Sequence, residues 1–395
     1  MSESAPKRIL FIDDEPALFD ALTRVMRPMH GWEVQVESSP AAAMERLKTE
    51  SFDVVVADRR MPLLDGVSIL SQVMQRSAES MRVLSDDLEP DPFPRKAPAN
   101  QQFLAKATEV EGLKETITRI SRMRDRMHDD NMRALIGNID GLPAMPAICQ
   151  ELNRLLAHEE YSMREVAGVV EKDPALCAKI LQVVNSPYFG VGRKLTQVHD
   201  AVAYLGTSMV KNLVTSLTLW RTLEGVRPSA IGQLQRVHAR CQRVGGLARK
   251  VMGKDRAQGE EAFVSGLLHE IGVTLLIAYL PERYDRISAE MLKTGLSFSE
   301  VERSLYTVDH AELGAHLLDA WKLPFQILEA VAFHHSAPNL RHDKLKPADA
   351  VYIAQSVLDG RDRGLEIDEC VDDAYIAQLG CEQQVQQWAA WLKEV

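Results

Sequence analysis

Two short apolar runs near the start of the chain each end in acidic residues. The run 9–12 is followed by Asp13 and Asp14, and the run 54–57 is followed by Asp58. Such runs alternate with amphipathic stretches, and this alternation predicts an α/β, doubly wound, parallel five-stranded sheet. The carboxyl ends of parallel strands meet at one edge of a sheet. We therefore expect the three carboxylates to lie together.

The alternation extends over the first 106 residues of the chain. The expected strands cover residues 7–12, 32–37, 52–57, 81–85 and 102–106, and the expected helices cover residues 15–28, 39–49 and 66–76. A fourth helix would fall in the segment that contains Pro90, Pro92, Pro94 and Pro98. Because each proline removes a donor and disfavours helix at the preceding residue, we expect this helix to be irregular.

A cluster of three carboxylates at one sheet edge favours a hard cation. Like charges repel when they are packed together, so a divalent cation or protonation must relieve them. Mg²⁺ suits the site, because it binds carboxylate oxygens and keeps several waters. Ser85 and Lys106 end two further expected strands. Their hydroxyl and ammonium groups could each hold an oxygen of a phosphoryl group on Asp58.

A simpler explanation exists for any one of these residues, because acidic residues and serine favour turns. The ordered set, with Met61-Pro62 and Asp65-Gly66 after the acid, resembles the receiver domain of two-component response regulators. The resemblance covers about residues 6–122, and we assign residues 1–122 to this domain. Receivers usually have proline after the lysine, and here Ala107 stands in its place.

The resemblance implies a role for each residue of the set. It implies that Asp58 is the phospho-acceptor, that Asp13, Asp14 and Asp58 hold Mg²⁺ with help from the Arg59 or Arg60 carbonyl, that Ser85 is the switch hydroxyl, and that Lys106 pairs with the phosphate. It also implies that a sensor histidine kinase or a phosphotransfer protein is a partner. Treatment with acetyl phosphate and Mg²⁺ tests the acceptor.

Length and charge narrow the class of protein. A chain of 395 residues exceeds what one hydrophobic core supports, so two or three domains are expected. The net charge of −10 argues against direct binding of nucleic acid and of anionic membranes. We find no apolar signal core and no uninterrupted apolar stretch of membrane-spanning length, which predicts a cytoplasmic protein. The five widely spaced cysteines are typical of unpaired thiols.

The remaining chain is predicted to be helical. Residues 109–138 read as one long connector helix that overlaps the last receiver helix and spans roughly 40 Å. It could pair with a second copy in a homodimer or remain a solvated connector. Capping-box spacing at Ser162 and Ser297, and Asp173-Pro174, mark helix starts in an all-α domain over residues 139–360. Residues 361–395 are expected to form a helical extension packed on that domain.

Seven of the eleven histidines lie between His238 and His342. Imidazoles and carboxylates on facing helices are how helical domains build metal sites, although each histidine alone is more often a core or surface residue. The stretch Gly266-Leu267-Leu268-His269-Glu270-Ile271-Gly272 resembles the His-Asp-Ile-Gly signature of the HD phosphohydrolase superfamily.

The longer pattern is similar to the HDOD domain, a degenerate HD relative found in signalling proteins. Its further motifs here are Leu142-Pro143, Asp173-Pro174, Asn185-Ser186-Pro187-Tyr188-Phe189, Ala203-Tyr204-Leu205-Gly206, Asp309-His310-Ala311-Glu312-Leu313-Gly314, Trp321-Lys322-Leu323-Pro324 and His334-His335. The resemblance implies that the possible residual HD-site ligands are His238, His269, Glu270, His310, His334 and His335.

Two departures argue against hydrolysis. Glu270 is one methylene longer than the expected aspartate, and Gln355 replaces the last aspartate ligand. Losing an anionic ligand weakens the hold on a dication and its power to acidify water. Ser336-Ala337-Pro338-Asn339 also differs from the Gly-Tyr-Pro signature of the enzymes that cleave cyclic di-GMP. We expect a non-enzymatic module that binds a downstream protein; the alternative is a receiver-gated, metal-dependent phosphohydrolase or cyclic-dinucleotide phosphodiesterase.

Overall fold

The computed structural model describes most of the chain. The described residues are 6–14, 32–58, 61, 66–76, 80–86, 102–105, 123, 130–137, 143–158, 161–321, 323–342, 344–364, 369–385 and 387–388. The chain divides into two compact units, Met1–Arg122 and Met123–Val395.

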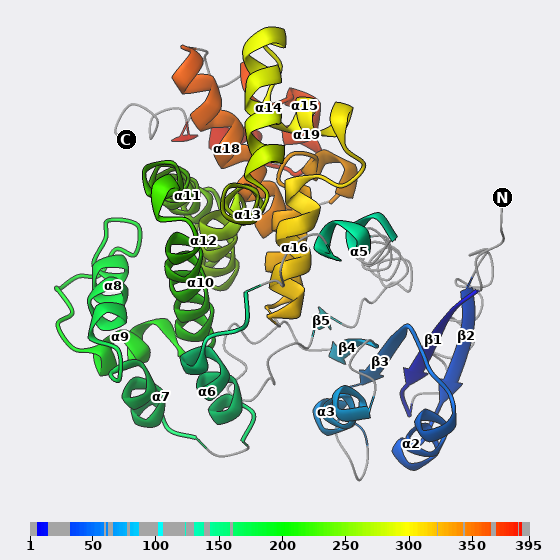
Figure 1. Ribbon diagram of the computed structural model, residues 1–395. Coiled ribbons are helices and arrows are strands. Elements are labelled where there is room, and N and C mark those ends of the chain that lie inside the picture. The colour runs from blue at the N-terminus through cyan, green and yellow to red at the C-terminus, as the bar shows by residue number, and fades with distance from the viewer. Residues whose placement is uncertain are drawn as a thin grey trace. The chain divides into compact units, whose positions relative to one another are not determined.

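The first unit is built on a parallel sheet with the strand order β2-β1-β3-β4-β5. Its strands, drawn in shades of blue in Figure 1, are β1 (Lys7–Ile12), β2 (Trp32–Glu37), β3 (Val54–Asp58), β4 (Met81–Asp86) and β5 (Gln102–Ala105). Because β1 lies between β2 and β3 and pairs with β3 in parallel, the carboxyl ends of β1 and β3 lie side by side. The predicted parallel sheet is confirmed.

Helices α2 (Pro40–Thr49) and α3 (Gly66–Arg76) pack on this sheet. The Ser39 hydroxyl accepts a hydrogen bond from the Ala42 amide and so caps α2, and proline suits the first position of that helix. The core is formed by alternate residues of β1 and β3 with side chains of both helices: Leu10, Ile12, Val55, Ala57, Ala43, Ile69, Leu70 and Val73. The expected helix over residues 15–28, the proline-rich segment and Lys106 lie outside the described residues.

Helices are the regular elements of the described part of the second unit. They are α5 (Asp130–Gly137), α6 (Ala147–Leu156), α7 (Met163–Val170), α8 (Pro174–Val184), α9 (Val198–Leu205), α10 (Thr207–Val226), α11 (Ile231–Val251), α12 (Arg256–Leu268), α13 (Ile271–Tyr279), α14 (Pro281–Thr294), α15 (Phe298–Leu305), α16 (His310–Ala320), α17 (Phe325–Phe333), α18 (Pro347–Arg363) and α19 (Asp373–Gln378), with 3-10 turns at Pro228–Ala230, Ala337–Leu340 and Glu382–Gln384. The expected helical domain is confirmed.

Local sequence signals set several of these helix starts. Ser162 and Ser297 each form a capping box with the glutamate three residues later, and Asp173 caps α8 ahead of Pro174. Asp309 forms a third capping box at the start of α16. The predicted starts at Ser162, Asp173 and Ser297 are therefore confirmed.

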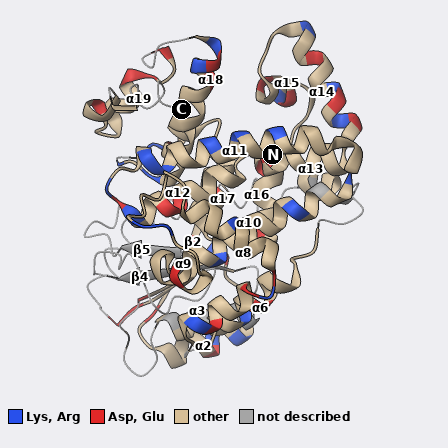
Figure 2. Ribbon diagram, turned by 90° about the vertical axis from the view of Figure 1, so that its left-hand side faces the viewer, with Lys and Arg blue, Asp and Glu red and all other residues tan. Residues whose placement is uncertain are grey.

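Helices α12 and α13 form the apolar centre of this unit. The stretch Arg256–Tyr279 is long and apolar enough to cross a membrane by length and composition, which corrects our reading that the sequence holds no such stretch. Because 89% of its most apolar window is buried, it matches the core helix of a folded domain. In Figure 2, by contrast, the outer helix α14 carries basic and acidic segments along its length.

The C-terminal segment shares a core with the helical body. Tyr375 and Ile376 of α19, together with Trp388, pack in one cluster with residues of α11 and α18. The Tyr375 hydroxyl also donates to Asp349 of α18 at 2.6 Å. At the other end of the unit, the Trp321 indole donates to the Pro143 carbonyl at 2.8 Å and holds the segment that leads into α6. Of the expected connector helix, only Met123 and α5 lie within the described residues.

Candidate functional sites

The first site lies at the carboxyl edge of the parallel sheet. The register pairs Ile12 with Ala57 across β1 and β3, so Asp13 and Asp58 leave neighbouring strands at the same level. One carboxylate oxygen each of Asp13, Asp14 and Asp58 lies within 4.8 Å of the other two. Asp13 and Asp58 are buried and Asp14 is exposed. The strand ends thus bring together the three acids expected from the sequence.

Ser85 belongs to the neighbouring strand. The register pairs it with Asp58 across β3 and β4, which places its backbone beside the acid. Carboxylates of this kind form a site for a hard cation, and the exposed Asp14 leaves one side open to a ligand. The described residues therefore bring three carboxylates together at one point, a set that suits a hard cation.

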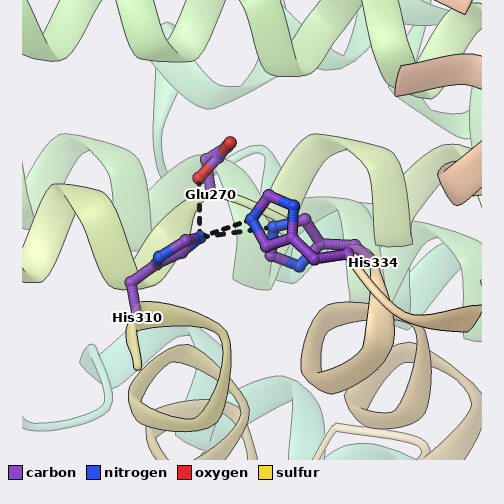
Figure 3. A group of neighbouring side chains, drawn as sticks. Glu270, His310 and His334 are labelled. Atoms are coloured by element: carbon purple, nitrogen blue, oxygen red, sulfur yellow. Dashed lines mark hydrogen bonds and ion pairs between the residues drawn. The ribbon is translucent and has the colours of Figure 1, made fainter. Parts of the chain in front are cut away.

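The second site is a cluster in the helical unit. The side chains of Glu270, His310, His334 and His335 each offer a ligand atom, and these atoms lie within 4.8 Å of one another. Glu270 comes from the turn between α12 and α13, His310 is the first residue of α16, and the two adjacent histidines follow α17. Figure 3 shows the dashed contacts of the cluster meeting at one ring nitrogen of His310.

The spacing of the ligand atoms fits a metal. Nε2 of His310 lies 3.0 Å from Nε2 of His335, 3.3 Å from Nε2 of His334 and 3.3 Å from Oε2 of Glu270. Two ligand atoms about 2.05 Å from a tetrahedral ion are separated by roughly 3.3 Å. The same residues also fit a proton-bridged cluster.

The outward-facing ring nitrogens of two histidines determine which nitrogen faces the cluster. Nδ1 of His334 lies 2.7 Å from the Val331 carbonyl, and Nδ1 of His269 lies 2.7 Å from the Gly266 carbonyl. A carbonyl oxygen can only accept, so both imidazoles carry their proton on Nδ1 and present a lone pair on Nε2. This is the arrangement that metal-binding histidines use. Within the described residues, Nε2 of His269 is buried without a hydrogen-bond partner, which suits a nearby cation.

His269 lies at the border of the cluster. Its Nε2 is 3.9 Å from Glu270, and its ring meets that of His334 edge to face at 5.2 Å. His238, in contrast, is not brought into the cluster, which corrects its expected place among the ligands. Its ring stacks on the Trp220 indole at 4.4 Å and 10°, because α11 turns this residue toward α10. Burial lowers the pKa of His238 to about 4.

Gln355 was expected to replace a metal ligand, and the structure places it behind one instead. Its side-chain amide lies 3.5 Å from Nδ1 of His335, the ring nitrogen that faces away from the cluster. Among the described residues, Oε1 of Gln355 is buried without a partner. If the Gln355 amide is turned by half a rotation, its oxygen accepts a hydrogen bond from the Nδ1–H group of His335. Nε2 of His335 then carries the lone pair that a metal ligand needs.

Gly272 explains why the signature ends in glycine. A Cβ atom at this position would lie 1.8 Å from the carbonyl oxygen of His310 and 3.1 Å from the amide nitrogen of Gly314. Helices α13 and α16 therefore touch backbone to backbone, which only a residue without a side chain allows. This contact brings the His269-Glu270 turn against the start of α16.

Burial and ion pairing set the charges of the cluster. Burial lowers the pKa of His334 to about 3 and, with the neighbouring imidazoles, holds the pKa of His335 well below its usual range. Burial also opposes charge on His310, but ion pairing with Glu302 and Glu270 raises its pKa well above normal. Although burial raises the pKa of Glu270, His310 outweighs it and holds that pKa well below normal. Without metal, the cluster therefore holds one carboxylate, one imidazolium and neutral imidazoles.

These shifts predict that acid destabilises the metal-free helical unit. A histidine with a depressed folded pKa contributes stability that is present above its unfolded pKa of 6.5 and is lost as pH falls toward the folded value of about 3 for His334. Between pH 6.5 and pH 5, this one residue should cost about 2 kcal/mol. His310 has the opposite sign, since its contribution is lost only as pH rises through its raised pKa.

Urea unfolding of the chelator-treated protein at pH 7.5 and pH 5.0, followed by tryptophan fluorescence, measures this dependence. His334→Asn should flatten the profile, because asparagine takes up no proton. An equal loss of stability in the variant and the wild type would assign the effect to other groups.

Glu302 is a member of this site that sequence reasoning did not find. It is fully buried in α15, and its carboxylate lies 2.6 Å from Nδ1 of His310. Its one sequence signal is helical spacing, since it follows the buried Ser299 by three residues and so lies on the inner side of the helix. A carboxylate on an inner face needs a partner, but the sequence does not name that partner.

Family models match both units. Residues 9–117 match the response regulator receiver domain, and residues 142–337 match the HDOD domain. The sheet with its acidic edge and the helical unit with its histidine cluster define a signalling receiver joined to an HD-type helical domain. The chain belongs to the response regulators that carry an N-terminal receiver domain and a C-terminal HDOD domain. The receiver domain supports a role in two-component signalling.

Individual relatives resemble parts of the chain. An uncharacterized protein of Treponema pallidum is 25% identical over 211 residues, which are 52% of this chain and 40% of that protein. The transcriptional regulatory protein TrcR of Mycobacterium tuberculosis is 34% identical over 74 residues, 19% of this chain and 28% of that protein. The chain thus spans less than half of the length of these curated relatives.

A solved structure agrees with the fold of the helical unit. It comes from Shewanella amazonensis SB2B and is described as that of a candidate phosphohydrolase. It is 23% identical, has a TM-score of 0.52, and covers 68% of this chain and 95% of its own. At this level of identity the likeness shows the fold alone.

Proposed function

We propose that the protein is a two-component response regulator that is phosphorylated on Asp58. A sensor kinase or phosphotransfer protein supplies the phosphoryl group, and Asp13, Asp14 and Asp58 hold Mg²⁺. The HDOD domain then gains or loses a protein partner, because the phosphoryl group shifts the balance between two states of the protein. Ser85 and Lys106 are proposed to bind the phosphoryl oxygens.

The convergence of Asp13, Asp14 and Asp58 within 4.8 Å is the observation that carries this proposal. Two of these acids are buried side by side, which is costly unless a cation offsets their charge. Mg²⁺ bound there would neutralise the acids and an incoming phosphoryl oxygen together. The carboxylate of Asp58 attacks phosphorus and the bond to the donor's leaving group breaks, so the phosphoryl group moves intact to Asp58.

Acetyl phosphate with Mg²⁺ is expected to add the mass of one phosphoryl group to the intact protein. Asp58→Asn should abolish this increase, because an amide lacks the nucleophilic carboxylate. Asp53→Asn is the matched control: Asp53 precedes the same strand at its far end and accepts a hydrogen bond from the Arg8 amide. An unmodified wild type in intact-mass spectrometry would contradict the proposal.

The output step needs its own test. The full chain, treated with beryllofluoride as a phosphoryl mimic, is used as bait beside the untreated chain. We expect a protein that is retained by one form and not by the other, and that shows no such difference with Asp58→Asn. Equal retention by both forms would contradict signalling through a protein partner.

A second function is favoured by the histidine cluster. We propose that Glu270, His310, His334 and His335 hold a transition-metal dication such as zinc, iron or manganese, with His269 beside them. Nitrogen spacing near 3 Å, Nδ1 protons on backbone carbonyls and a buried Nε2 without a partner among the described residues support this fit. A dication bound there would acidify a water molecule, which is the chemistry of a phosphohydrolase.

Metal binding and hydrolysis are separable. Stoichiometric metal in the purified protein, without cleavage of cyclic dinucleotides, would support a metal-stabilised interaction domain. Turnover that His269→Ala abolishes would favour the hydrolase. Absence of both would leave the receiver-driven interaction as the function of the chain.

A further inference from the structure

Glu302 accepts two hydrogen bonds from His310. Its Oε2 atom accepts a hydrogen bond from Nδ1 of His310 at 2.6 Å and another from the backbone amide of His310 at 2.8 Å. Glu302 is 0% exposed and His310 is 1% exposed. One carboxylate oxygen therefore fixes both the main chain and the ring of the residue that lies at the centre of the cluster.

This double contact determines which nitrogen faces the cluster. The ring cannot turn about its side-chain bonds without breaking the bond to Nδ1, so Nε2 stays directed at Glu270, His334 and His335. A carboxylate on Nδ1 also keeps the proton there and makes Nε2 the more basic atom. His334 and His269 use backbone carbonyls for this purpose, whereas His310 uses a charged side chain.

Arg283 holds the carboxylate in place. Its Nη2 atom donates to Oε1 of Glu302 at 3.1 Å, and its guanidinium lies over the Tyr306 ring at 4.0 Å. Arg283 also donates to the Val308 carbonyl in the loop before α16. A buried carboxylate is tolerated only when its charge is matched, and Arg283 and His310 provide that match.

We propose that Glu302 is a positioning residue that makes Nε2 of His310 a metal ligand. It acts through His310 and does not itself touch the metal. This inference rests on the metal binding proposed above, and it adds a residue from outside the ligand set and a chain of contacts that runs from α14 through α15 to α16.

Glu302→Gln tests the inference, because it keeps the size of the side chain and removes its charge. Zinc affinity of the full chain, measured by competition with a chromophoric chelator, should fall about 10- to 100-fold. Glu302→Asp keeps the charge and should recover part of the loss. Asp349→Asn is the matched control: Asp349 is equally buried and lies 2.7 Å from Nδ1 of His342, a pair outside the cluster. It should leave zinc affinity unchanged.

A second measurement needs no metal. In a proton NMR spectrum of the full chain labelled with ¹⁵N-histidine, the Nδ1 proton of His310 should resonate far downfield, because it lies in a short, charge-assisted hydrogen bond. It is assigned by its loss in His310→Asn. Glu302→Gln should move this resonance upfield, and Asp349→Asn should not.

The two readouts keep the proposals distinct. If the wild type binds no zinc but its downfield proton responds to Glu302→Gln, the metal proposal would be contradicted. The hydrogen bond between Glu302 and His310 would still be supported. A wild type that binds zinc, with Glu302→Gln binding equally well or leaving the resonance unmoved, would overturn the positioning role. Circular dichroism of each variant shows that the helical unit is folded.

Discussion

Replacing His334 with alanine is expected to lower zinc affinity about a hundredfold. Structural zinc sites bind with about 10–16 kcal/mol, so each of four ligands contributes about 3 kcal/mol, and every 1.4 kcal/mol is a tenfold change. His334 is 1% exposed and its Nε2 lies 3.3 Å from Nε2 of His310. Chelator competition on the full chain measures the change.

His238→Ala is the informative comparison. The sequence places His238 among the possible ligands, whereas the structure stacks its ring on Trp220, outside the cluster. Zinc affinity should therefore be unchanged in this variant. A large loss with His238→Ala and none with His334→Ala would mean that the metal binds elsewhere, and the assignment of ligands would be wrong.

The acidic edge of the sheet is the feature that sequence reasoning predicts best. Strands buried on both faces read as continuous apolar runs, and a polar residue marks their end. Asp13, Asp14 and Asp58 could therefore be placed at one edge from pattern alone, and the structure brings them within 4.8 Å. The register of β3 and β4, which pairs Asp58 with Ser85, follows from the same ends.

The histidine cluster was predicted only in part. The sequence pattern shows that a segment is helical, but it does not show which neighbouring helix each side of it faces. Helix α11 could present His238 to several neighbours, and packing against Trp220 decided the outcome. The sequence places Gln355 near the site. Whether it faces Nδ1 or Nε2 of His335 depends on how α17 and α18 pack. Glu302 was missed because a hydrogen bond between α15 and α16 leaves no motif in the sequence.

The structure shows where the two residues that depart from the HD signature, Glu270 and Gln355, lie relative to the histidines. Glu270 is longer than aspartate, yet its carboxylate reaches within 3.3 Å of His310. Gln355 faces the rear of His335 and is suited to orient that ring. Loss of the late aspartate therefore removes an anion from the expected set while three histidines and one glutamate stay clustered. Three imidazoles and one carboxylate form a donor set that suits a transition-metal dication.

Gly272→Ala is expected to destabilise the helical unit by about 3 kcal/mol or more, because overpacking against a backbone cannot be relieved by rotating a side chain. The added Cβ would lie 1.8 Å from the His310 carbonyl, so α13 and α16 must separate. That movement displaces His310 from Glu270, and zinc affinity should fall together with stability. Urea unfolding and chelator competition on the same samples measure both.

A graded series of glycines isolates the cause. At Gly314 a Cβ would meet its nearest atoms at 3.0 Å, and at Gly168 of α7 it would meet nothing within 4 Å. Gly314→Ala should therefore cost less than Gly272→Ala, and Gly168→Ala should stabilise by up to about 1 kcal/mol, since alanine favours helix and narrows the unfolded ensemble. If Gly272→Ala matched Gly168→Ala, the close contact of α13 with α16 would not exist in solution. The geometry that joins the signature turn to His310 would then have to be abandoned, together with the ligand set built on it.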